Sequence, residues 1–136
     1  CFARLRPLLW APGAGGSRHP GARAPAPHYV RRAEEIMSAE AREAPTIGQV
    51  AQRVGVSART LSEGFRRFRG ITPRSFLAAR RLDGLKADLE TAPSERSISG
   101  IAADWGYVNA GALAGAYRRR FGELPSHTRY ANGRMP

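Results

Sequence analysis

The sequence predicts an all-α protein built from two repeated helical hairpins. Apolar residues recur at helical spacing from Tyr29 onward, and no alternating apolar stretch is long enough for a β-strand. A block of sequence that begins near residue 46 also returns about 51 residues later. Residues 1–28 are rich in Pro, Gly and Ala and contain no acid, which predicts a flexible linker or the end of a preceding domain. The folded part is therefore expected at residues 29–136.

The first predicted helix follows this linker. One face of it carries apolar residues at i, i+4, i+7 and i+8, namely Tyr29, Ala33, Ile36 and Met37. Pro45 ends the segment, because proline cannot continue a helix interior.

A first hairpin is predicted at about residues 46–69. Thr46 and Gln49 have the spacing of a capping box, in which each side chain bonds a free amide at the helix start. Gly55 marks a turn, and Ser57 is placed to cap the second helix of the pair.

A long linker helix is predicted next, at about residues 73–90. Its inward face carries an apolar stripe made of Ala78, Leu82, Leu85 and Leu89. Gly84 inside this helix costs up to about 1 kcal/mol relative to alanine, so packing must compensate for it.

The repeat predicts a second hairpin at about residues 97–121. A displacement of 51 relates Ile47, Val50, Ala51 and Gly55 to Ile98, Ile101, Ala102 and Gly106. A displacement of 52 relates Leu61, Phe65, Arg66, Arg67, Gly70 and Pro73 to Leu113, Tyr117, Arg118, Arg119, Gly122 and Pro125. One extra residue in the second turn explains why the displacement rises from 51 to 52. Each copy has the short helix, glycine turn and longer helix of a helix-turn-helix, so two tandem helix-turn-helix subdomains are expected.

The charge indicates the partner. The formal net charge is +11, with 22 Lys+Arg against 11 Asp+Glu, and Lys86 is the only lysine. Arginine's planar fork suits phosphate groups and base edges. Two basic helix-turn-helix patterns in tandem therefore predict binding to double-stranded DNA.

The stretch "TIGQVAQRVGVSARTLSEGFRRFRGITPRSFLAARRL", followed by "SISGIAADWGY" and "AYRRRFGELPSHTR", resembles the DNA-binding domain of AraC/XylS-family bacterial transcription regulators. The resemblance covers roughly residues 28–130. It implies transcription regulation, RNA polymerase as a partner, and an effector ligand bound by an N-terminal domain that this chain lacks. The chain begins with Cys1 rather than methionine, so we expect a fragment of a longer protein; the alternative is a lipid-anchored mature terminus that begins at cysteine.

The second helix of a helix-turn-helix, called the recognition helix, is the one that enters the DNA groove. In the first hairpin this helix is expected at residues 58–69, and it offers three candidate base-reading residues, Arg59, Ser62 and Glu63. Arginine to guanine is the commonest specific contact, and a carboxylate accepts from the cytosine amine. By resemblance, these positions carry base contacts in the family. The alternative is a solvated helix face on which Glu63 pairs with an arginine four residues away.

The second recognition helix has little hydrogen-bonding reach. Asn109 is expected as a helix cap or a base reader, and Ala112 as a contact to a thymine methyl. Phosphate contacts are expected in both hairpins, from Thr46, Arg66, Arg67, Arg69, Arg118, Arg119 and Arg120. With a linker helix of roughly 25 Å, the two hairpins are expected to enter successive major grooves, about 34 Å apart.

Other functions are disfavoured. The single cysteine excludes an internal disulfide and a cysteine-based zinc site. No polar constellation suggests an enzyme, so we expect no catalytic residue, metal or cofactor, no membrane contact, and a cytoplasmic location. Two alternatives stay open. One is a non-specific architectural DNA-binding protein, and the other is a helical module that binds protein rather than DNA.

Overall fold

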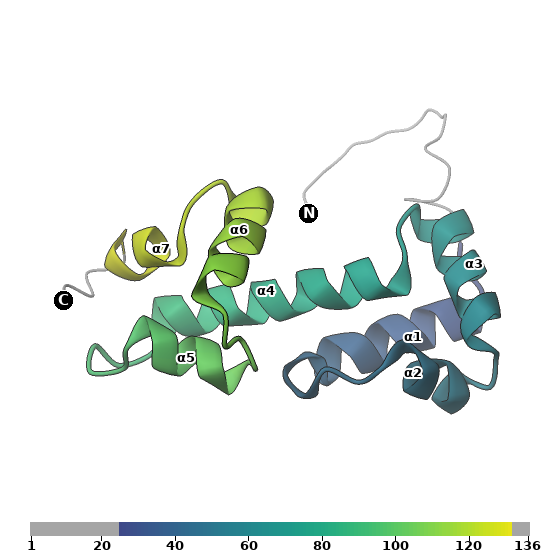
Figure 1. Cartoon of the computed structure of the whole chain (residues 1–136). Helices are drawn as coiled ribbons and strands as arrows, with labels where there is room; N and C mark the ends of the chain where they lie inside the picture. The colour runs from purple at the N-terminus through teal and green to yellow at the C-terminus, as the bar shows by residue number, and fades with distance from the viewer. Residues whose placement is uncertain (1–24, 132–136) are drawn as a thin grey trace. The chain divides into compact units, whose positions relative to one another are not determined.

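The computed structural model describes residues 25–131. This part of the chain contains seven α-helices, one 3₁₀ helix and no strand, which confirms the all-α prediction (Figure 1). In chain order the elements are α1 (His28–Ala39), η1 (Ala41–Glu43), α2 (Ile47–Val54), α3 (Ala58–Arg69), α4 (Pro73–Thr91), α5 (Ile98–Asp104), α6 (Ala110–Phe121) and α7 (Pro125–Ala131). The linker predicted at residues 1–28 lies almost entirely outside the described residues.

The chain forms two compact units. The first contains the described residues up to Ala33 together with Ile47–Pro73, and therefore holds α2 and α3. The second contains Glu34–Thr46 and the chain from Arg74 onward, and therefore holds nearly all of α4 and the helices after it.

The first unit is the predicted first hairpin with the start of α1 packed on it. The apolar faces of α2 and α3 meet in a core of fully buried side chains, among them Val50, Leu61 and Phe65. A Cβ at Gly64 would meet the ring of Tyr29, so this glycine lets α1 approach α3 closely.

The second unit is built on α4. Leu82, Leu85 and Leu89 are buried as predicted, but Ala78 is exposed and the buried position is taken by Leu77 instead. The larger side chain gains more from leaving water, so the predicted stripe was wrong at its first residue.

The structure gives the two hairpins matched turns and caps. Gly55 and Gly106 both have φ +82°, a left-handed conformation that glycine adopts without strain. Ser57 caps α3 through a bond from the Thr60 amide, and Asn109 caps α6 in the same way. The extra residue of the second turn is Val108, which is 94% exposed.

Two elements were not predicted, η1 and α7. The helix α7 begins at Pro125, which corresponds by the displacement of 52 to Pro73 at the start of α4. The repeat therefore extends beyond each hairpin into the first turn of the helix that follows it, α4 after the first hairpin and α7 after the second.

Candidate nucleic-acid interface

The exposed face of α3 carries the predicted base-reading residues. Arg59 and Glu63 have side chains that are 87% and 63% exposed, and Ser62 is half-buried. The Arg59 Nε atom donates to Glu63 Oε2 at 3.2 Å, so the i,i+4 pair of the alternative interpretation is present. An ion pair this exposed is worth little, which leaves both side chains easy to redirect towards a ligand.

The basic end of α3 lies beside this face. Arg66 and Arg67 are exposed, whereas Arg69 is half-buried and donates to the Phe68 carbonyl oxygen at 3.2 Å. The guanidinium of Arg67 lies 5.4 Å from the centre of the Phe68 ring. Thr46 is exposed and directly precedes α2, as expected for a residue at a helix start.

The corresponding face of α6 carries almost no side chain that could form a hydrogen bond. Its first turn exposes Ala110, Gly111 and Ala112. The Asn109 Oδ1 atom accepts from the Ala112 amide at 2.9 Å, which favours the cap over the base reader for this residue.

The three arginines at the end of α6 differ in their contacts. Arg118 and Arg119 are exposed. Arg120 instead forms two bonds to the Asp83 carboxylate on α4, from Nε at 2.8 Å and from the terminal nitrogen at 2.9 Å. This bidentate pair ties α6 to α4, so the predicted phosphate role of Arg120 has a structural competitor.

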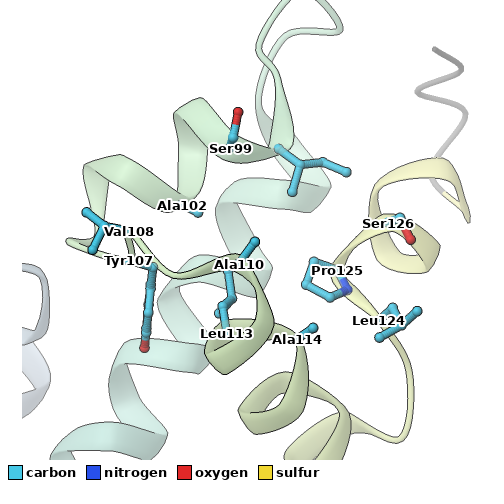
Figure 2. Close-up of a pocket in the computed structure, with 11 residues that line it drawn as sticks. Ser99, Ala102, Tyr107, Val108, Ala110, Leu113, Ala114, Leu124, Pro125 and Ser126 are labelled. Atoms are coloured by element: carbon cyan, nitrogen blue, oxygen red, sulfur yellow. The ribbon is translucent and has the colours of Figure 1, made fainter.

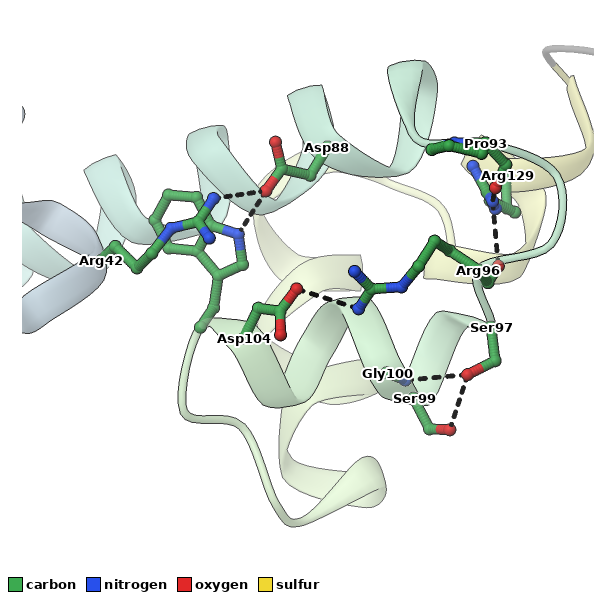
Figure 3. Close-up of polar contacts among 10 residues, drawn as sticks. Arg42, Asp88, Pro93, Arg96, Ser97, Ser99, Gly100, Asp104 and Arg129 are labelled. Carbon is green, nitrogen blue, oxygen red and sulfur yellow. Dashed lines mark hydrogen bonds and ion pairs between the residues drawn. The ribbon is translucent and has the colours of Figure 1, made fainter.

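A polar cluster fixes the turn of the second hairpin against α4 and η1. The Trp105 indole N–H donates to Asp88 Oδ2 at 2.8 Å, and Arg42 donates to the same oxygen at 2.8 Å (Figure 3). The Arg42 guanidinium also lies 4.7 Å from the centre of the Trp105 ring. A Cβ at Gly84 would overlap that ring. Close packing against Trp105 is therefore the compensation that Gly84 requires.

Arg81 holds the same turn from its other side. Its Nε atom donates to the Ala41 carbonyl oxygen at 3.0 Å, and its terminal nitrogen hydrogen-bonds the Trp105 carbonyl oxygen. The guanidinium lies 5.1 Å from the centre of the Tyr107 ring. Burial raises the pKa of Tyr107, and the charge of Arg81 opposes that shift. Sequence reasoning missed this cluster because its residues come from three separate elements.

Arg129 joins α7 to the end of α4 within the second unit. It is only 3% exposed, and its guanidinium donates to the carbonyl oxygens of Leu89, Ala92, Pro93 and Arg96 at 2.5 to 3.0 Å. These carbonyls belong to the end of α4 and the chain that follows it (Figure 3). The sequence signal was the tail "LPSHTR", whose last residue is this arginine.

An open cavity of about 370 Å³ lies where α5, α6 and α7 begin. Figure 2 shows its lining, which includes Leu113 and Ala114 from α6 and Pro125 from α7. None of the lining residues is charged.

Between residues 25 and 131, no group of three or more His, Cys, Asp or Glu side chains could hold a metal ion. No helix in this range combines the length and apolar character needed to cross a membrane.

The family comparison matches this arrangement. A model described as a helix-turn-helix domain matches residues 50–131. A probable thc operon regulatory protein of Rhodococcus erythropolis is 39% identical over 101 residues, which are 74% of this chain and 30% of that protein. The chain thus spans about a third of the length of this relative.

Solved structures show the same fold. A probable AraC family transcriptional regulator from Rhodopseudomonas palustris CGA009 matches with a TM-score of 0.72 and 30% identity, over 78% of this chain and 98% of that one. The DNA-binding domain of AdpA, solved in complex with a target DNA, matches with a TM-score of 0.65 and 26% identity, over 75% of this chain and 90% of that one. The duplicated hairpins, their capped turns and these matches together establish that the chain belongs to the AraC/XylS family of helix-turn-helix domains.

Proposed function

We propose that this chain binds double-stranded DNA sequence-specifically and that it regulates transcription. The observation that carries the proposal is the exposed face of α3, where Arg59 and Glu63 stand free of the core with their only described bond to each other. In a helix-turn-helix, this face of the second helix is the one that enters the major groove.

Arg59 is the main base-reading residue in this proposal. Guanine offers O6 and N7 to a guanidinium, and Arg59 has to release only an exposed and therefore weak ion pair to reach them. Glu63, once released, is placed to accept from a cytosine amine, while Ser62 donates or accepts beside them.

Phosphate contacts come from arginines around the two reading faces and from one hydroxyl at a helix start. We assign them to Thr46, Arg66, Arg67, Arg69, Arg118 and Arg119. We give Arg120 no phosphate contact, because its Nε atom and one of its terminal nitrogens are bonded to Asp83.

Salt dependence tests the proposal. Binding to unrelated duplexes is measured at two salt concentrations, alongside a duplex selected for tight binding. A sequence-specific protein keeps the selected duplex at the higher salt, where its affinity for the others has fallen away. Equal loss of all duplexes would instead favour the architectural alternative, and no affinity for any duplex would overturn DNA binding altogether.

The variant Arg118→Ala, measured in the same experiment, tests one of the assigned phosphate contacts. Removing one phosphate contact should weaken all duplexes alike and lower the slope of log affinity against log salt by about one unit.

Two further partners follow from the same proposal. AraC/XylS relatives carry names of operon regulators and activators, and they are longer than this chain. We therefore propose RNA polymerase and an effector-binding domain as further partners. We also propose that the two hairpins occupy successive major grooves of one site.

A further inference from the structure

The two recognition helices place very different side chains at equivalent positions. The displacement of 52 takes Arg59, Ser62 and Glu63 of α3 to Gly111, Ala114 and Gly115 of α6. None of these three side chains can donate or accept a hydrogen bond, so α6 lacks the base-reading groups of α3.

Arg119 lies on the same stripe of α6. Gly111, Gly115 and Arg119 are spaced at i, i+4 and i+8, and side chains on a helix lean towards its N-terminus. A terminal nitrogen of Arg119 lies 3.3 Å from the point where a Cβ on Gly115 would stand. The guanidinium therefore rests against the backbone at the place that Glu63 occupies in α3.

The charges around the two arginines also differ. On α3, Arg59 is bonded to Glu63. The α6 sequence contains no acid, and two acids of this unit have bonds elsewhere, Asp83 to Arg120 and Glu123 to Thr128. Nothing on α6 thus competes with a base for Arg119.

We propose that Arg119 is the base-reading residue of the second hairpin and that it recognises guanine. Its guanidinium donates to O6 and N7 in the major groove, the pairing that arginine makes most often. The glycine at 115 leaves room for the side chain along the reading face, and it adds no carboxylate that Arg119 would have to leave before meeting a base. This inference rests on the proposed function, and it moves Arg119 from the phosphate contacts to the base contacts.

The test uses duplexes selected from a random pool by the wild-type chain, by Arg119→Ala and by Arg118→Ala. A base reader and a phosphate contact differ in pattern: losing the first relaxes one position, whereas losing the second weakens all sequences alike. Arg119→Ala should lower the preference for one guanine about tenfold, and Arg118→Ala should leave every position unchanged.

Replacing that guanine by 7-deazaguanine removes N7 and sharpens the test. The wild type should lose about tenfold in affinity, whereas Arg119→Ala should lose nothing further. A second variant, Gly115→Glu, places a carboxylate four residues before Arg119. It should weaken the same guanine preference only about twofold, because an exposed i,i+4 ion pair is worth less than about 1 kcal/mol.

The outcomes separate this inference from the proposed function. A selected motif in which Arg119→Ala relaxes no position would overturn the inference and leave sequence-specific binding intact. Failure of the wild-type chain to enrich any motif would overturn both.

Discussion

At the end of the first hairpin, Pro73 begins a helix of 19 residues, whereas at the end of the second, Pro125 begins one of seven. The difference follows from what each helix must do next. The first helix is α4, on which the second unit is built. The second stops, and the carbonyls at the end of α4 are bonded by its Arg129, where the first copy has the buried apolar Leu77.

The interiors of the two hairpins also differ, because the second has a hydroxyl that forms a hydrogen bond at a position where the first has a phenylalanine ring. Phe65 and Tyr117 are equivalent and both fully buried, but the Tyr117 hydroxyl bonds the Thr128 hydroxyl at 2.7 Å. Thr128 in turn donates to Glu123. Burial raises the pKa of Tyr117, partly offset by the bond to Thr128. The first copy is closed by apolar packing, and the second by a chain of hydrogen bonds.

The largest effect expected from breaking this contrast is that of Arg129→Met. Four backbone carbonyls lose a charged donor in a buried place, which should lower the free energy of unfolding by about 3 kcal/mol. Urea unfolding measures it. A loss below about 1 kcal/mol would show that water replaces the guanidinium and that the bonds of Arg129 to the four carbonyl oxygens are not needed for stability.

Gly84→Ala comes next. The new methyl group would overlap the buried Trp105 ring, so we expect a loss of about 2 kcal/mol, in the range of overpacked cores. Gly64→Ala is the matched variant in the first unit. There the Cβ meets the hydroxyl end of the half-buried Tyr29, which can move, and a smaller loss is expected in the same unfolding experiment. Equal losses would mean that the Trp105 cluster is no more rigid than the α1 contact.

Arg59→Ala tests the reading face without touching a core. The side chain is 87% exposed, so stability should hardly change, while preference at one base of the site should fall about tenfold. Selection from random duplexes measures the preference. If every position kept its preference, base reading by Arg59 would be wrong.

The smallest effects concern the matched caps. Ser57→Ala and Asn109→Ala should each cost about 1 kcal/mol of stability, because each side chain bonds one amide at a helix start. Asn109→Asp keeps the cap and should restore the stability. Should Asn109→Ala leave stability unchanged and alter the selected motif, the residue would be a base reader after all.

The fold was largely predictable because its signals are local. Helical spacing, the glycine turns and the cap at Ser57 each depend on residues that lie within a few positions of one another. Short elements without a periodic pattern were missed, as η1 and α7 show.

The site was only partly predictable. Exposure of Arg59 and Glu63 followed from the helical pattern, but the bonds of Arg120, Arg129 and Trp105 join residues 17 to 40 positions apart. No local pattern encodes such contacts. The position of Arg119 against Gly115 also depends on a side-chain conformation that spacing alone does not give.

The most direct test of the account is a selection of duplexes from a random pool by this chain at elevated salt. We expect a motif in two parts, one with several specified bases read by α3 and one dominated by a single guanine read by α6. Recovery of duplexes with no common sequence would contradict the central claim that the duplicated hairpins recognise a specific DNA site.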